Sequence, residues 1–366
     1  MKKDKFIDLI SEDALELLTA SGPKLVEKIG IDIIRGVVLD VLTGRNLRDS
    51  TERLTRKRIA MLNLSLLEMF IKGASERHNF IEELPSFASK RLCTKSICKE
   101  ERWIAQWMLG LTDKAFQNVL MDDRMNVTRY VEEYKRTCQE VVDKFKETRG
   151  DLVGTLSINS NTKAEINLLF ITYLLNTIGS ETLTIRGSEK SAYGKLFEKL
   201  ILGSLLSILG FKFVDRENPS GLKKVFWLAQ QGERRESDAT LLYKAGKGVR
   251  FDIGFIGRGN PEISLDKVTR FEREIELQEQ KWYLATIIIV DRIGKKSRIE
   301  ALANKIGGTI IQMSMSYWPK QVATELSNTI GYSHELVRMP DDKIDDYLKE
   351  TIRKVPLETF LDFGDS

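Results

Sequence analysis

The run at residues 283–290, Tyr-Leu-Ala-Thr-Ile-Ile-Ile-Val, constrains the fold more than any other segment of this chain. Side chains alternate between the two faces of a β-strand, and this run is apolar on both faces. Such a strand is buried on both sides, as it is in the centre of a sheet that helices cover. We therefore expect a central sheet with helical layers, in which other strands flank this run.

The segments around this run alternate between helical and extended spacing. Gly210 follows a long apolar helix and is expected to end it as the glycine just past its last turn. The order of elements predicts a mixed central sheet flanked by helices, an α/β (α+β) fold. Helices are expected at residues 163–178, 189–209, 265–278, 296–306 and 319–330, a loop at 179–188, and further strands at 211–214 and 309–313.

Residues 1–148 show the apolar spacing of amphipathic helices and almost no strand signals. Residues 150–162 are rich in Gly, Ser, Asn and Thr, which indicates a linker or a small strand connection. Residues 101–120 read as helix, turn and helix, which fits either a helix-turn-helix or a plain helical hairpin. We place a helical domain at residues 1–150 and a second domain at residues 163–366.

The composition excludes several classes of enzyme. Among 366 residues there are only two histidines and three cysteines, with no paired CxxC, so a disulfide framework, a structural zinc site, an HNH-type nuclease site and a Ser-His-Asp triad are not supported. The signature loops of nucleotide-triphosphate and dinucleotide enzymes are absent from the sequence. Any chemistry must therefore depend on carboxylates and lysines.

The charge and hydropathy of the chain fit a soluble protein. The 57 basic side chains nearly balance the 53 acidic ones, so a net charge of +4 permits a polyanionic partner without demanding one. The longest apolar run, residues 200–211, is about half the roughly 20 residues that a membrane span needs. We expect a cytoplasmic protein that does not enter a membrane.

Two acidic residues lie where buried strands normally hold aliphatic side chains. Asp238 belongs to the extended segment 236–243 and Asp252 to the segment 248–256, and residues 244–248 close a hairpin between them. Directly opposed residues in a hairpin lie roughly 5 Å apart. Two carboxylates held at that separation can share a hard divalent cation through their oxygens, whereas they repel each other without one.

A third carboxylate lies on an apolar helix. Residues 191–211 are apolar nearly all round, so this helix is expected to be buried. Glu198 falls on the same stripe as Leu202 and Leu205, and a buried carboxylate needs a cation or hydrogen-bond donors. It serves either the acidic site or a structural ion pair with a lysine or arginine.

The order of these features resembles the core of the PD-(D/E)XK nucleases. A helix with a buried Glu, a Gly-Phe pair, a Ser-Asp hairpin with a second acidic strand, a helix and a hydrophobic strand follow one another over residues 189–313. Asp238 matches the PD aspartate and Asp252 the second acid. The segments 186–198, 235–238 and 250–255 further resemble type II restriction endonucleases of the CfrBI-like kind.

One position departs from the pattern of that superfamily. Its lysine lies two residues beyond the second acid, where this chain has Gly254. The glycine leaves space for a lysine from a neighbouring element, and Lys267 is the candidate, with Arg258 and Lys247 as weaker ones. Without such a residue the chain would be a binding-only relative.

The resemblance implies a Mg²⁺-dependent enzyme that cuts double-stranded DNA at a specific site and leaves 5′-phosphate ends. Asp238, Asp252 and Glu198 would be metal ligands, and Lys267 would orient the attacking water. The resemblance also implies a homodimer on a palindromic site in the cytoplasm of a prokaryote, a cognate DNA methyltransferase, and a helical region that serves dimerisation, DNA contact or both. The residues expected to contact phosphates are Arg186, Lys190, Lys195, Arg258 and Arg270.

Two other functions remain open at this point. A DNA repair or junction nuclease would use the same core but cut according to DNA structure. A non-catalytic DNA-binding protein would keep its acids as ion pairs. Dependence of activity on a divalent metal separates both nucleases from the binding protein.

Overall fold

The structure is a computed structural model, and its helices and strands form two compact units. It describes residues 5–20, 22–94, 96–120, 124–159, 161–214, 223–229, 237–255, 285–291, 308–314 and 317–361. One unit comprises Met1–Ala20 and Leu54–Lys190, and the other comprises Ser21–Arg53 and Ser191–Ser366. The helices α4 (Leu47–Glu76) and α9 (Leu168–Ile208) run through both units.

The first unit is mainly helical, as its apolar spacing predicts. Its core combines buried aromatic and aliphatic side chains of several helices, including Phe70, Trp107 and Phe170. Besides parts of α4 and α9, it contains η1 (Phe6–Asp8), α1 (Glu12–Thr19), α5 (Phe80–Leu92), α6 (Lys99–Trp107), α7 (Asp113–Ala115), η2 (Phe116–Leu120), α8 (Arg124–Arg149), β1 (Gly154–Ile158) and β2 (Thr162–Ile166).

The structure settles one ambiguous segment of this unit and describes the turn in another. The Gly- and Ser-rich stretch is a strand connection, because β1 and β2 pair antiparallel from Gly154↔Ile166 to Ile158↔Thr162. In residues 101–120, Gly110 turns the chain with φ 70° and the Thr112 hydroxyl accepts a hydrogen bond from the Ala115 amide at 3.2 Å. Trp107 and Phe116 are buried, so these aromatic side chains belong to the core.

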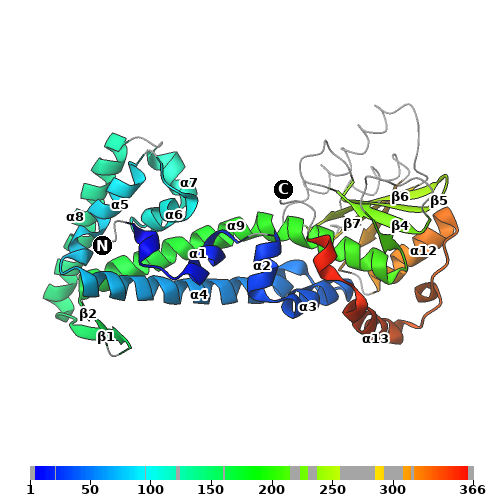
Figure 1. Cartoon of the computed structure of the whole chain (residues 1–366), viewed down its shortest axis with the longest axis horizontal. Coiled ribbons are helices and arrows are strands. Elements are labelled where there is room, and N and C mark those ends of the chain that lie inside the picture. The colour runs from blue at the N-terminus through cyan, green and yellow to red at the C-terminus, as the bar shows by residue number, and fades with distance from the viewer. Residues whose placement is uncertain are drawn as a thin grey trace. The chain divides into compact units, whose positions relative to one another are not determined.

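The prediction of a loop at residues 179–188 is wrong. Figure 1 shows α9 as one uninterrupted helix, and it includes both Gly179 and Gly187. Glycine and β-branched residues weaken an isolated helix, but tertiary packing overrides this preference. Ile185 is fully buried, and the Thr184 hydroxyl donates to the Ser180 carbonyl and accepts from the Trp107 indole.

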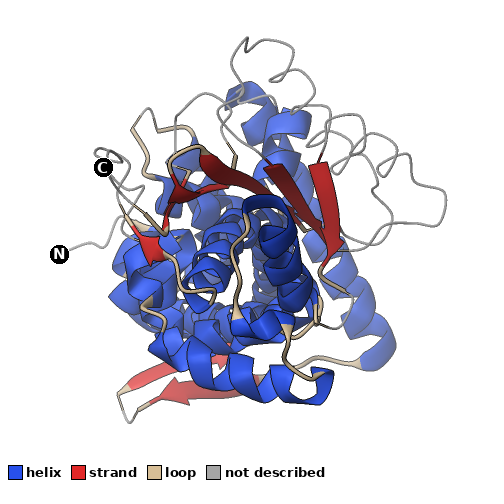
Figure 2. Cartoon of the chain, turned by 90° about the vertical axis from the view of Figure 1, so that its right-hand side faces the viewer, coloured by secondary structure: helices blue, strands red, loops and turns tan. Residues whose placement is uncertain are grey.

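The second unit is built on a six-stranded mixed sheet, which confirms the expected fold class. Figure 2 shows its strands as one twisted layer accompanied by helices. The sheet has the order β3-β4-β5-β6-β7-β8, in which β4, β5 and β6 are successively antiparallel and the pairs β3/β4, β6/β7 and β7/β8 are parallel. The strands are β3 (Lys212–Phe213), β4 (Val225–Leu228), β5 (Ala239–Lys244), β6 (Lys247–Gly254), β7 (Ala285–Val290) and β8 (Gly308–Gln312).

The helices of the second unit come from three parts of the chain. They are α2 (Gly22–Ile29), α3 (Ile31–Leu42), the ends of α4 and α9, α12 (Trp318–Ile330), α13 (Asp341–Thr351), and the short η3 (Glu335–Val337), η4 (Ile352–Lys354) and η5 (Leu357–Phe360). The predicted helices at residues 265–278 and 296–306 lie outside the described residues. Strand β4 was not predicted from the sequence.

Residues 21–53 belong to the sheet-containing unit, although they precede most of the helical one. The Trp318 indole donates to the Val41 carbonyl at 2.8 Å, and the Arg35 guanidinium donates to the carbonyls of Ile352 and Val355. The units are thus not divided at a single point near residue 150. The functional roles expected for the two domains stay predictions.

The core of this unit explains one glycine of α9. A Cβ at Gly203 would lie 2.7 Å from the Phe360 ring, so only glycine permits this close approach. Gly210 ends the helix with φ 82°, as its position in the sequence predicts. Among the described residues, one helical segment, Leu168–Ser188, is long and apolar enough to cross a membrane by length and composition, and half of its most apolar stretch is buried inside the protein.

Candidate active site

The hairpin of β5 and β6 carries the two aspartates. The strands pair antiparallel with Ala239 opposite Phe251 and Thr240 opposite Arg250, and continuing this register by one residue sets Asp238 opposite Asp252. Gly246 adopts φ 72° in the short turn that joins the strands. The predicted hairpin is therefore present, and its register is the one that brings the acids together.

Asp238 is hydrogen-bonded to the backbone directly next to Asp252. The Ile253 amide donates a hydrogen bond of 2.8 Å to Oδ2 of Asp238, directly beside Asp252. Asp252 is 1% exposed, whereas Asp238 is half-buried at the start of β5. One carboxylate is thus held in the sheet interior, and the other lies next to it at the sheet margin.

The strand neighbours of Asp252 are apolar. Strand β6 pairs in parallel with β7, and Asp252 lies opposite Ile288. Ile287, Ile288 and Ile289 are fully buried, as are Phe251 and Ile253 on either side of the acid. Removing a carboxylate from water in such surroundings carries a large desolvation cost, which a bound cation or hydrogen-bond donors must offset.

The donor set of this pair suits a hard divalent cation. Carboxylate oxygens are the ligands that Mg²⁺ takes from proteins, usually one or two per ion. Within the described part of the chain, no three acidic, histidine or cysteine side chains gather closely enough to hold a metal ion. Glu198 is half-buried on α9 and does not join the two aspartates in such a group. Its role as a ligand stays a prediction.

Comparisons with known proteins identify the family of the chain. Residues 31–298 match the sequence pattern of the family described as CfrBI restriction endonuclease. The chain belongs to the CfrBI restriction endonuclease family. It is 38% identical over 360 residues to the type II restriction enzyme CfrBI of Citrobacter freundii, and this match covers 98% of the chain and 99% of that enzyme. No solved structure matches the chain.

The missing lysine is not resolved for this member of the family. Gly254 is buried at the end of β6, opposite Val290 of β7. Lys267 and Arg258 lie outside the described residues. Lys247 lies at the other end of β6, five residues from Asp252, where its Nζ donates to the Ile330 carbonyl at 2.9 Å. The prediction that Lys247 replaces the missing lysine is wrong, because the Cα atoms of strand residues five positions apart are roughly 16 Å from each other.

The predicted phosphate contacts are only partly described. Arg186 and Lys195 are exposed residues of α9, which places Arg186 in the first unit and Lys195 in the second. The side chain of Lys190 and the whole of Arg270 lie outside what the structure describes, as does Arg258. DNA contact by these residues therefore stays a prediction.

One buried acid near this site was missed by sequence reasoning. Asp291 follows β7 directly and is 8% exposed. Its Oδ2 accepts a hydrogen bond of 2.5 Å from Asn46, whose own Oδ1 accepts from the Arg48 amide at the start of α4. An acid directly after a buried strand was a usable signal, since the carboxyl ends of the parallel strands β6 and β7 meet at one edge of the sheet. The asparagine partner, 245 residues away, was not visible in the sequence.

Proposed function

We propose that this type II restriction endonuclease hydrolyses phosphodiester bonds in both strands of DNA at a specific, palindromic sequence, depends on Mg²⁺ and leaves 5′-phosphate ends. The observation that carries the proposal is the pair of adjacent carboxylates, Asp238 and Asp252, at one end of a buried hairpin. Family membership supports the substrate and the reaction class.

The two aspartates would hold the cation, each through a carboxylate oxygen. Bound there, Mg²⁺ supplies charge that neutralises phosphate oxygens and lowers the pKa of a bound water. The Ile253 amide fixes the orientation of Asp238 through Oδ2. The buried β6 backbone fixes Asp252, so neither carboxylate has to be ordered when substrate arrives.

Two further residues complete the proposed site. Glu198 would act through a water molecule, since it forms no metal-holding group with the aspartates among the described residues. Lys267 would bring the ammonium group that Gly254 does not provide, and would orient the attacking water and stabilise the developing negative charge. Arg186, Lys190, Lys195, Arg258 and Arg270 would contact phosphates, which set the register of the protein on the duplex.

We also propose that the enzyme acts as a homodimer. Exposed large apolar side chains of the first unit occur on three helices: Met61 and Leu64 on α4, Met125, Val141 and Phe145 on α8, and Leu175 and Leu183 on α9. Val141 and Phe145 lie one helical turn apart on α8, and their burial against a second copy would remove apolar surface from water. A two-fold dimer matches a palindromic site. The enzyme would work in the cytoplasm of a prokaryote, together with a DNA methyltransferase that protects the host's own sites.

The decisive experiment is cleavage of a long, sequence-diverse duplex DNA with Mg²⁺ and with EDTA, by the wild type, Asp252→Asn, and Asp345→Asn. Asp345 is exposed on α13 and serves as a matched loss of one carboxylate. Discrete fragments are expected from the wild type and Asp345→Asn with Mg²⁺ alone. Full cutting by Asp252→Asn, or in EDTA, would refute the proposed site.

Other outcomes distinguish the alternative functions. Cutting that follows branches or mismatches rather than sequence would favour a repair or junction nuclease. DNA binding without cutting under any divalent metal would favour a binding protein. Analytical ultracentrifugation of the wild type and of a Val141→Lys/Phe145→Glu variant tests the dimer, which the variant should dissociate.

A further inference from the structure

Arg250 lies on the same face of β6 as Asp252, because side chains alternate along a strand. The opposite face of β6 is apolar, and three of its members are fully buried: Val249, Phe251 and Ile253. Glycines at positions 248 and 254 stand on either side of the two charged residues. The face that holds the acid thus also holds one cation, two residues before Asp252, while the position two residues after it has no side chain.

Strand pairing places Arg250 beside both aspartates. Arg250 is opposite Thr240, and the same register continued by two residues sets Asp238 opposite Asp252. The Cα atoms of residues two positions apart on one strand are separated by roughly 6.7 Å. Diagonal neighbours across an antiparallel pair are separated by roughly 7–8 Å, which a long side chain can span. Arg250 is therefore about equally far from the two acids and can reach the space next to each.

The burial of Arg250 favours an anion close to its guanidinium. Arg250 is half-buried, and residues 251–254 that follow it are all buried. Its neighbours on the adjacent strands are Thr240 of β5 and Thr286 of β7, which carry no charge. A guanidinium that is partly removed from water needs negative charge nearby. The acids that this face of the hairpin offers are Asp238 and Asp252.

The same two carboxylates cannot fully balance both a divalent cation and Arg250. Their two negative charges match the double charge of one Mg²⁺, so the charge of the guanidinium is left over. The proposed Glu198 and Lys267 carry opposite charges and cancel each other. Each phosphate of a DNA strand carries one negative charge, which would balance the excess. The charges of this group therefore favour a substrate phosphate as the anion that Arg250 contacts.

We propose that Arg250 is a catalytic residue whose guanidinium donates hydrogen bonds to the scissile phosphate and supplies positive charge that Gly254 cannot. This inference rests on the proposed function, which provides the phosphodiester. A guanidinium suits the task because its forked donors match the oxygens of a phosphate and it stays charged at any working pH. It stabilises the negative charge that develops during hydrolysis, while Lys267 keeps the role of orienting the attacking water.

The first test measures DNA binding by the full-length protein in EDTA, so that no metal contributes. The probe is a short duplex with the mapped cleavage site, in which the scissile phosphate is either natural or replaced by an uncharged methylphosphonate. If Arg250 contacts this phosphate, the replacement should weaken binding to the wild type about tenfold or more relative to its effect on Arg250→Gln. Arg250→Lys keeps the positive charge and should retain part of that difference.

The second test separates contact with the phosphate from a role in holding the aspartates. With Mg²⁺, Arg250→Gln should cut the natural duplex about 10²- to 10³-fold more slowly in single-turnover assays, and Arg250→Lys should lose less. Calorimetric titration of the free protein with Mg²⁺ should show binding to Arg250→Gln at least as tight as to the wild type, because a cation that repels the metal has been removed. Arg353→Gln is the matched control, because Arg353 is exposed in the same unit, and it should behave as the wild type.

Three outcomes would overturn the inference while the proposed function stands: cutting by Arg250→Gln at the wild-type rate, an equal effect of the methylphosphonate on both proteins, or weaker Mg²⁺ binding by the variant. The last would show that Arg250 only orders the aspartates. A wild type that cuts no DNA would instead refute the proposed function, and this inference with it. Urea unfolding of each variant ensures that rates and affinities refer to folded protein.

Discussion

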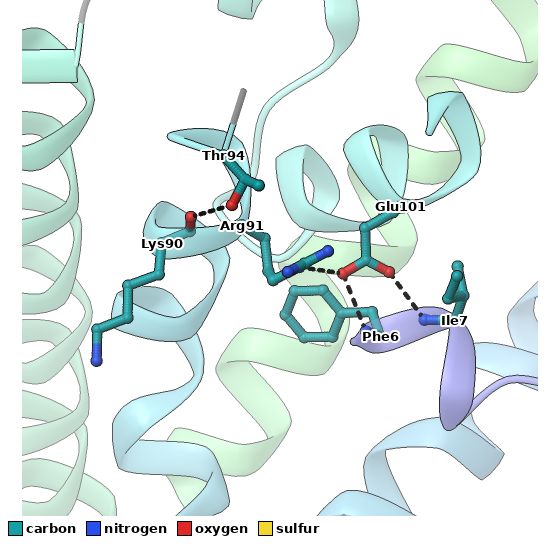
Figure 3. A network of polar contacts seen from close by, with 6 residues as sticks. All are labelled: Phe6, Ile7, Lys90, Arg91, Thr94 and Glu101. Atoms are coloured by element: carbon teal, nitrogen blue, oxygen red, sulfur yellow. Dashed lines mark hydrogen bonds and ion pairs between the residues drawn. The ribbon is translucent and has the colours of Figure 1, made fainter. Parts of the chain in front are cut away.

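Glu101 offers the sharpest test of how the helical unit is held together. Its side chain is 1% exposed, and its carboxylate accepts three hydrogen bonds, shown in Figure 3. The amides of Phe6 and Ile7 donate at 3.1 and 3.0 Å, and Nε of Arg91 donates at 2.7 Å. One acid on α6 thereby joins the amino-terminal turn η1 to α5.

The structure sets the expected magnitude. Removing the carboxylate in Glu101→Ala leaves two backbone amides without their acceptor, and the Phe6 amide is buried, so water cannot replace it. Each buried donor left unsatisfied costs about 1–3 kcal/mol. The Arg91 side chain is partly exposed and can bind water instead, so the loss of its ion pair adds little to the cost. We expect the free energy of unfolding to fall by about 3–5 kcal/mol, as for other buried pairs that lose one partner.

Urea unfolding and hydrogen exchange would measure this loss. Exchange should accelerate in peptides that cover residues 5–9 and 99–107, while the cutting rate per folded molecule stays unchanged. Lys90→Gln is the control, because Lys90 is exposed on α5 and points away from Glu101 in Figure 3. A loss below about 1 kcal/mol would show that this network does not secure η1, and would refute the reasoning.

Three further predictions concern the second unit. Lys267→Ala should lower the cutting rate by about 10²- to 10⁴-fold with DNA binding retained, and full activity in a cleavage assay would remove this residue from the site. Gly203→Leu should lower the free energy of unfolding in urea titrations by about 3 kcal/mol or more, because the leucine side chain would overlap the Phe360 ring. Gly194→Ala is the control and should be neutral or stabilising, because no atom lies within 4 Å of the added Cβ. Burial lowers the pKa of His334, so protonation favours the unfolded state, and the free energy of unfolding should fall as the pH drops below about 6.5. His334→Gln should lose that part of the pH dependence, and an unchanged profile between pH 7 and pH 5 would contradict this assignment.

The acidic hairpin could be predicted because its causes are local. A short turn with Gly246 sets the register of two adjacent strands, and the alternation of side chains then decides which residues oppose each other. Asp238 and Asp252 are only 14 positions apart, so one turn suffices to bring them together. The apolar run of β7 likewise predicted a covered sheet, because the alternation of side chains along a strand is also local.

Other features depended on contacts between distant parts of the chain. Glycines at 179 and 187 favour a break in α9, yet burial of Ile185 and the Trp107–Thr184 hydrogen bond keep the helix continuous. The local sequence pattern does not show which distant residues contact this helix. Local propensity is worth less than about 1 kcal/mol per residue, so tertiary burial outweighs it.

The sequence by itself determined that a helix-covered sheet is present, that two acids face each other in a hairpin and that the first unit is helical, because periodicity and turn chemistry act over a few residues. Only the tertiary structure decided that residues 21–53 join the sheet-containing unit and that Asn46 meets Asp291. These outcomes depend on which surfaces pack together when the whole chain buries its apolar area, and that choice involves residues up to 320 positions apart.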